Sequence, residues 1–85
     1  MSTSTTLDTL RKGEAARIDD IQRGDARVAQ RLLALGLLPG CELTVTAIAP
    51  TGDPITVTTS RGIISLRRTE AAGVYVTTVP RVAAS

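Results

Sequence analysis

One stretch of the sequence, VAQRLLALGLLPGCELTVTAI at residues 28–48, changes its hydrophobic period halfway along. Val28, Leu32 and Leu35 recur at the spacing of an amphipathic helix of about three turns. From Cys41 onward, apolar and polar residues alternate, as they do in a half-buried strand. The stretch therefore predicts a single helix that leads directly into a β-rich unit.

Turn and cap signals mark the ends of this helix. Asp25 can cap its N-terminus, and Gly36 stands where a helix takes a left-handed C-terminal cap. Pro39-Gly40 then predicts a tight turn before the first strand of the β-rich unit. Two consecutive leucines, Leu37 and Leu38, follow the cap, and they cannot easily both point inward, so we expect one to be exposed.

Strand patterns surround this stretch on both sides. The expected strands cover residues 14–21, 43–47, 55–58, 63–66 and 74–79, and residues 69–73 form a short helical turn or loop. Short strands in so small a chain predict a mainly β fold with one α-helix, arranged as a closed or nearly closed barrel. We expect the folded unit to span residues 7–79, between a disordered N-terminal tail (1–6) and a C-terminal tail (80–85).

The composition excludes several classes of function. The 85 residues contain no His, Trp or Phe, one Tyr (Tyr75) and one Cys (Cys41). An intramolecular disulfide is impossible, and the commonest metal ligand and general base is missing. A single tyrosine cannot line a groove for proline-rich peptides. We therefore expect no enzyme activity, no bound metal and no cofactor.

The charge of the chain is nearly balanced, with ten basic and eight acidic residues and a net charge of +2. A nucleic-acid-binding barrel is an alternative that the basic pI of about 9.3 permits. No run of Lys or Arg exceeds two residues, and base-stacking aromatics are missing, so we expect no nucleic-acid partner. We also expect no membrane insertion, because the longest apolar run, residues 32–38, is far shorter than a membrane span.

Four segments together resemble one family of bacterial proteins. They are QRLLALGLLPG (30–40), APTGDPI (49–55), RGIISLRRTEA (61–71) and VYV (74–76). The combination is similar to the ferrous-iron transport protein A (FeoA) family over residues 7–79. The resemblance implies an SH3-like barrel in the cytoplasm that is a non-enzymatic accessory protein of iron uptake. Its partner would be the membrane ferrous-iron transporter FeoB, which carries a cytosolic GTPase domain.

The same pattern also occurs at the C-terminus of iron- and manganese-responsive repressors, so a metal-linked regulatory domain is a further alternative. Exposed strand edges and a Leu37/Leu38 patch would permit weak self-association.

Six residues are candidates for contact with a partner: Arg27, Arg31, Leu37, Leu38, Pro39 and Arg67. The arginines would dock on an acidic surface, and Arg67 is the arginine of its pair, Arg67-Arg68, that matches the family pattern. Each candidate also has a structural interpretation, in which the leucines fill the core, Pro39 builds the turn and the arginines form a solvated face. Asp53 is expected to act as a turn former.

Overall fold

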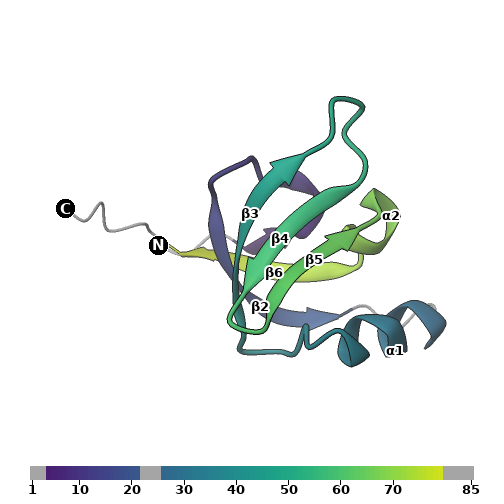
Figure 1. The fold of residues 1–85 in the computed structure, drawn as a ribbon. Coiled ribbons are helices and arrows are strands. Elements are labelled where there is room, and N and C mark those ends of the chain that lie inside the picture. Colours follow the sequence, from purple (N-terminus) through teal and green to yellow (C-terminus); the bar gives the residue numbers. More distant parts are fainter. Residues whose placement is uncertain (1–3, 22–25, 80–85) are drawn as a thin grey trace.

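The computed structural model describes residues 4–21 and 26–79, and it consists mainly of β-strands (Figure 1). In chain order the elements are β1 (Ser4–Thr6), η1 (a 3-10 turn, Leu7–Thr9), β2 (Ala15–Ile21), α1 (Ala26–Ala34), β3 (Glu42–Ile48), β4 (Ile55–Thr59), β5 (Gly62–Leu66), α2 (Arg68–Ala71) and β6 (Val74–Val79). The predicted strands and the predicted helix are therefore confirmed to within two residues at each described end. The expected cap at Asp25 lies outside the described residues.

The six strands form one antiparallel sheet in the order β1-β6-β2-β3-β4-β5. The sheet curls, so that β3, β4 and β5 lie in front of β6 and β2 in Figure 1. One continuous cluster of buried aliphatic side chains fills the space between these two parts, with contributions from β2 to β6 and from both helices. The enclosed core is what the alternating strands required, because each strand has only one apolar face to bury.

Strand β4 illustrates the alternation of buried apolar residues with outward-facing polar residues. Ile55 and Val57 are fully buried, whereas Thr56 and Thr58 lie on the outer face. The hydroxyl of Thr58 lies 3.2 Å from that of Thr46 on β3, within hydrogen-bonding distance. A one-residue shift in register would exchange these two sets of side chains, so the buried pair holds the strand in place.

The expected disorder of residues 1–6 is wrong for the part that is described. Ser4–Thr6 form strand β1, which pairs antiparallel with β6 from Ser4↔Thr77 to Thr6↔Tyr75. The sequence signal is weak because these short polar side chains bury little apolar area, and the strand is held by backbone pairing instead. The segment that follows is tied down further by Leu7, which is completely buried. Residues 1–3 and 80–85 lie outside the described residues.

The helix α1 ends as the sequence predicts, and the geometry of this ending determines which of Leu37 and Leu38 is buried. Gly36 has φ +92°, the amide of Leu37 donates to the Leu32 carbonyl (3.0 Å), and the amide of Gly36 donates to the Leu33 carbonyl (3.0 Å). This is the hydrogen-bond pattern of a Schellman cap, which places Leu37 against Leu32. Leu37 is accordingly fully buried, and Leu38 is 37% exposed. Leu37 is therefore a core residue and not a surface residue available to a partner.

The turn after this cap is also explained locally. Gly40 has φ +93° and follows Pro39, and the amide of Cys41 donates to the Leu38 carbonyl at 3.0 Å. Proline at the second position and glycine with positive φ at the third are what a type II turn requires. The amide of Gly40 also donates to the carbonyl of Ile18 on β2 (2.7 Å), which joins the turn to the sheet.

The different positions of the two leucines lead to a direct prediction. Leu37→Ala leaves a cavity in the core and should lower the free energy of unfolding by about 2–5 kcal/mol. Leu38→Ala, a matched change one residue later, should cost about 1 kcal/mol or less because that side chain is partly solvated. Urea denaturation of the two variants beside the parent chain measures both values, and equal losses would contradict the burial assignment.

Candidate functional site

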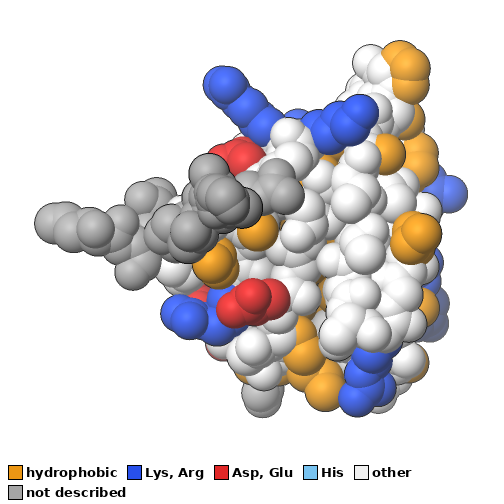
Figure 2. All heavy atoms as spheres, turned by 60° about the vertical axis from the view of Figure 1, so that its left-hand side comes forward, with side chains coloured by type: hydrophobic (Ala, Val, Ile, Leu, Met, Phe, Trp, Pro, Cys, Tyr) orange, Lys and Arg blue, Asp and Glu red, His pale blue; other side chains and the backbone are white. Residues whose placement is uncertain are grey.

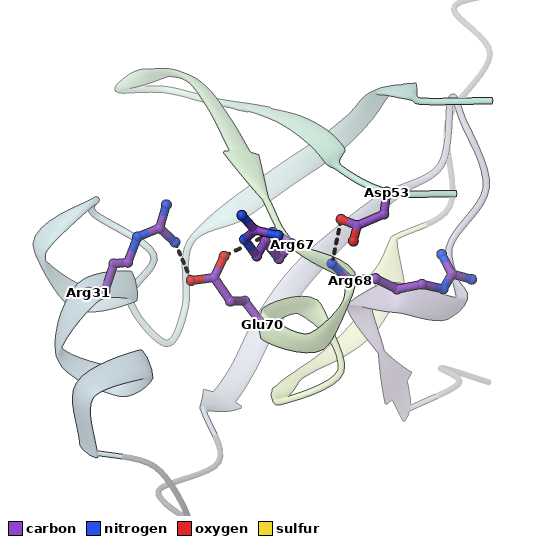
Figure 3. A network of polar contacts seen from close by, with 5 residues as sticks. All are labelled: Arg31, Asp53, Arg67, Arg68 and Glu70. Carbon is purple, nitrogen blue, oxygen red and sulfur yellow. Dashed lines mark hydrogen bonds and ion pairs between the residues drawn. The ribbon is translucent and has the colours of Figure 1, made fainter. Parts of the chain in front are cut away.

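Helix α2 begins at the end of β5, and two carboxylates satisfy its first amides. The Glu70 Oε1 atom accepts a hydrogen bond from the Arg67 amide (2.9 Å), and the Asp53 Oδ1 atom accepts one from the Arg68 amide (3.0 Å) (Figure 3). The first amides of a helix have no partner within the helix, so such acceptors stabilise its start. An arginine side chain has no acceptor atom, so Arg67 cannot return the bond, and the cap is one-sided.

The second oxygen of Glu70 reaches the other helix. Oε2 forms an ion pair with Nη1 of Arg31 on α1, as drawn in Figure 3. The Glu70 side chain is 11% exposed, whereas the Arg31 side chain is 50% exposed. Glu70 therefore connects α1 to the start of α2 from the inside, and Arg31 remains accessible from outside.

A shallow depression of about 310 Å³ lies beside this ion pair and is open to solvent. It is lined by Arg31, Asp53, Pro54, Ser65, Leu66 and Arg67. Arg31 and Arg67, which belong to separate sequence motifs, thus line the same depression. The Asp53-Pro54 peptide bond is cis, and the turn that contains it forms another part of the lining.

The other predicted contact residues lie outside this lining. Arg27 is exposed on α1, one helical turn before Arg31. Leu38 and Pro39 are exposed in the loop that follows α1, and Leu37 is buried, as described above. The structure therefore brings together two of the six candidates and leaves three on the neighbouring surface of α1 and its loop.

Sequence reasoning missed the central residue of the site. Glu70 had no predicted role at a site, although it stands three residues after the residue that precedes α2, where a helix-start glutamate accepts a backbone amide. Asp53 does lie in a turn, as expected, but its additional role as an acceptor for Arg68 depends on a contact between distant segments. The guanidinium of Arg68 also donates to the Gly52 carbonyl (3.1 Å) and ties that turn to α2.

The end of α1 has a further contact with the sheet. The side chain of Arg61, in the turn between β4 and β5, lies over Gly36, and its Cδ atom is 2.8 Å from where a Cβ would stand on that glycine. Gly36 is required by its positive φ, and a larger residue there would also displace the exposed Arg61 side chain.

The described residues can be compared with the ligand sets that hold metal ions in proteins. Over residues 4–21 and 26–79, no group of three or more His, Cys, Asp or Glu side chains is placed to hold a metal ion. Cys41 is partly buried at the start of β3 and is not disulfide-bonded. None of the described helices is long and apolar enough to cross a membrane.

The fold defines a small domain of the SH3-like class. The model of the FeoA domain matches residues 5–78, so the chain belongs to the FeoA family of ferrous-iron transport proteins. The FeoA protein of Chlorobium tepidum is 34% identical, with a TM-score of 0.82 over 89% of this chain and 71% of that one. The FeoA protein of Stenotrophomonas maltophilia, described as an SH3 domain protein and solved with zinc, is 32% identical, with a TM-score of 0.74 over 85% and 88% of the two chains.

A similar fold also occurs in a different setting. A manganese-dependent transcriptional repressor has a TM-score of 0.83 over 89% of this chain at 19% identity. This chain covers 37% of the repressor, so the similarity concerns the fold of one part of that protein. The expected relation to repressor domains is thus seen in the fold, whereas the chain itself is a FeoA-family member.

The two roles of Glu70 can be separated by substitution. Glu70→Gln should remove the ion pair but keep an acceptor for the Arg67 amide, and Glu70→Ala should remove both and cost about 1 kcal/mol more. A double-mutant cycle of Arg31→Gln with Glu70→Gln should give a coupling energy of about 0.5–1 kcal/mol, because Arg31 is half exposed. Chemical denaturation of the parent chain and the four variants measures these stabilities, and zero coupling would mean that the pair does not connect the helices in solution.

Proposed function

We propose that this chain is a non-catalytic accessory protein that docks on the cytosolic part of the ferrous-iron transporter FeoB, with its GTPase domain as the partner. Membership of a ferrous-iron transport family supports the process. The observation that carries the docking proposal is the convergence of Arg31 and Arg67 on one open depression. The lack of histidine and the single cysteine in the sequence support a binding role over a catalytic one.

The docking surface extends from the depression onto α1 and its following loop. Arg27 continues the basic face of the helix, and Leu38 and Pro39 provide exposed apolar area in the loop after the other end of the helix. A mixture of arginine and apolar contacts is typical of protein interfaces. Docking regulates the transporter only if the chain binds one conformational or nucleotide state more tightly than the other.

The shortage of aromatic residues favours a protein partner over nucleic acid. On the face of the molecule drawn in Figure 2, lysine and arginine side chains lie at the margins of a broad, mostly uncharged area. Tyr75, the single aromatic residue, is partly exposed on β6 and offers no platform for a run of stacked bases.

An NMR titration tests the docking proposal. The isotope-labelled chain is mixed with the isolated cytosolic GTPase domain of the transporter, with and without guanine nucleotide. We expect amide shifts at Arg31, Leu38 and Arg67, and Leu38→Ser should weaken binding about threefold to tenfold through lost apolar contact. Ile63→Ser is the matched control, because Ile63 is 74% exposed on β5 and belongs to neither the depression nor the α1 loop.

The outcomes of this titration are distinct. Shifts that depend on the bound nucleotide support regulation of the GTPase. The absence of shifts at high partner concentration contradicts docking on that domain, and equal weakening by Leu38→Ser and Ile63→Ser contradicts the assigned surface.

A further inference from the structure

We infer that the depression beside Arg31 and Arg67 recognises a carboxylate side chain on an extended segment of a partner protein. This inference rests on the proposed docking role and specifies the chemistry that the site accepts. It follows from how the two guanidinium groups are held, from where the neighbouring carboxylates lie, and from the shape of the lining.

Arg31 is oriented before any partner arrives. Its Nη1 atom is engaged from the inner side by Glu70, yet half of the side chain is accessible to solvent. A guanidinium has five N–H donors in a planar fork, so the ion pair with Glu70 leaves donors for a second acceptor. Orientation by a buried carboxylate lowers the entropy that a flexible arginine loses on binding.

Arg67 contributes the second guanidinium. Glu70 holds its backbone amide at 2.9 Å, which fixes the start of the side chain at the mouth of the depression. Within residues 4–21 and 26–79, the Arg67 side chain is exposed, and no residue accepts a hydrogen bond from its guanidinium. The two arginines therefore present free donors to the same space, which suits a carboxylate held by charge-assisted hydrogen bonds.

The neighbouring acidic groups argue for a single carboxylate and against a polyanion. Both Glu70 oxygens are already engaged, by Arg31 and by the Arg67 amide. Asp53 lies on the far side of Arg67 from Arg31 in Figure 3, and one of its oxygens accepts the Arg68 amide. The Glu70 carboxylate occupies the inner side between the two arginines, so an incoming carboxylate has to bind their outer donors from the solvent side. A run of phosphates across the depression would also meet the negative charge of Asp53.

The rest of the lining suits a length of peptide. Pro54 is exposed and adds apolar surface, whereas Leu66 is fully buried beneath the depression. The Ser65 hydroxyl, 3.4 Å from that of Thr56, adds a polar contact. The depression is open and small, so it fits one or two side chains of a segment lying across it, and it does not enclose a small molecule.

Synthetic peptides test this inference without the transporter. The isotope-labelled full chain is titrated with a short capped peptide of alternating Glu and Ser, and in parallel with its Gln-for-Glu counterpart. We expect saturable amide shifts at Arg31, Ser65 and Arg67 with the acidic peptide alone. Arg67→Gln should weaken this binding about threefold to tenfold, while keeping the amide that caps α2.

Arg11→Gln is the matched control for this variant. The Arg11 amide also donates to the carboxylate three residues further on, Glu14 (2.6 Å), and the Arg11 side chain is exposed outside the depression. The two variants therefore change the net charge equally, and binding by Arg11→Gln should remain at the level of the parent chain.

Three results would overturn the inference: equal shifts with the Gln peptide, equal weakening by both variants, or the same shifts from inorganic phosphate at equal concentration. Phosphate binding would identify a general anion site and not a carboxylate site. Binding of the GTPase domain without binding of the acidic peptide rejects this inference and retains the proposed function. Binding of the peptide without binding of the GTPase domain retains the carboxylate site and rejects the proposed docking on that domain.

Discussion

The buried carboxylate of Glu70 connects three parts of the molecule. One oxygen accepts the amide at the start of α2, directly after β5, and the other pairs with Arg31 on α1. A buried carboxylate is stabilised when both of its oxygens have hydrogen-bond partners, and here one partner comes from the start of α2 and the other from α1. Through these contacts Glu70 holds the Arg31 side chain and the Arg67 backbone beside the depression.

The core around this connection is made of aliphatic side chains alone. Without Trp or Phe, the barrel depends on close packing of Leu, Ile, Val and Ala from nearly every element. The Schellman cap contributes to this packing, because it turns Leu37 back onto Leu32 and brings Gly36 beneath Arg61. The same local motif that ends the helix therefore anchors it to the barrel and leaves Leu38 at the surface.

A binding role agrees with the way polar groups are distributed. Glu70 and Asp53 stabilise the fold through backbone amides, and the arginines around them project their charged ends into solvent. At this site one carboxylate, Glu70, is buried, and the arginine side chains around it are exposed. A chain with a net charge of only +2 can therefore present two accessible arginines, Arg31 and Arg67, at one depression.

Local patterns were sufficient to predict the strands, the helix, its glycine cap and the Pro39-Gly40 turn. These features depend on side-chain periodicity and on backbone angles that few residue types adopt, so neighbours in the sequence encode them. Strand β1 escaped prediction because it depends on pairing with β6, at the opposite end of the chain.

The site itself required contacts between distant segments. The geometry of the helix cap determined that Leu37, and not Leu38, enters the core, and the apolar pattern of the sequence alone does not distinguish the two residues. The meeting of Arg31 with Glu70, and of Asp53 with Arg68, arises only when the sheet curls and brings α1, β5 and the turn before β4 together. Charged side chains carry no periodic signal for such partners, because an ion pair between distant segments depends on where the buried apolar faces place them.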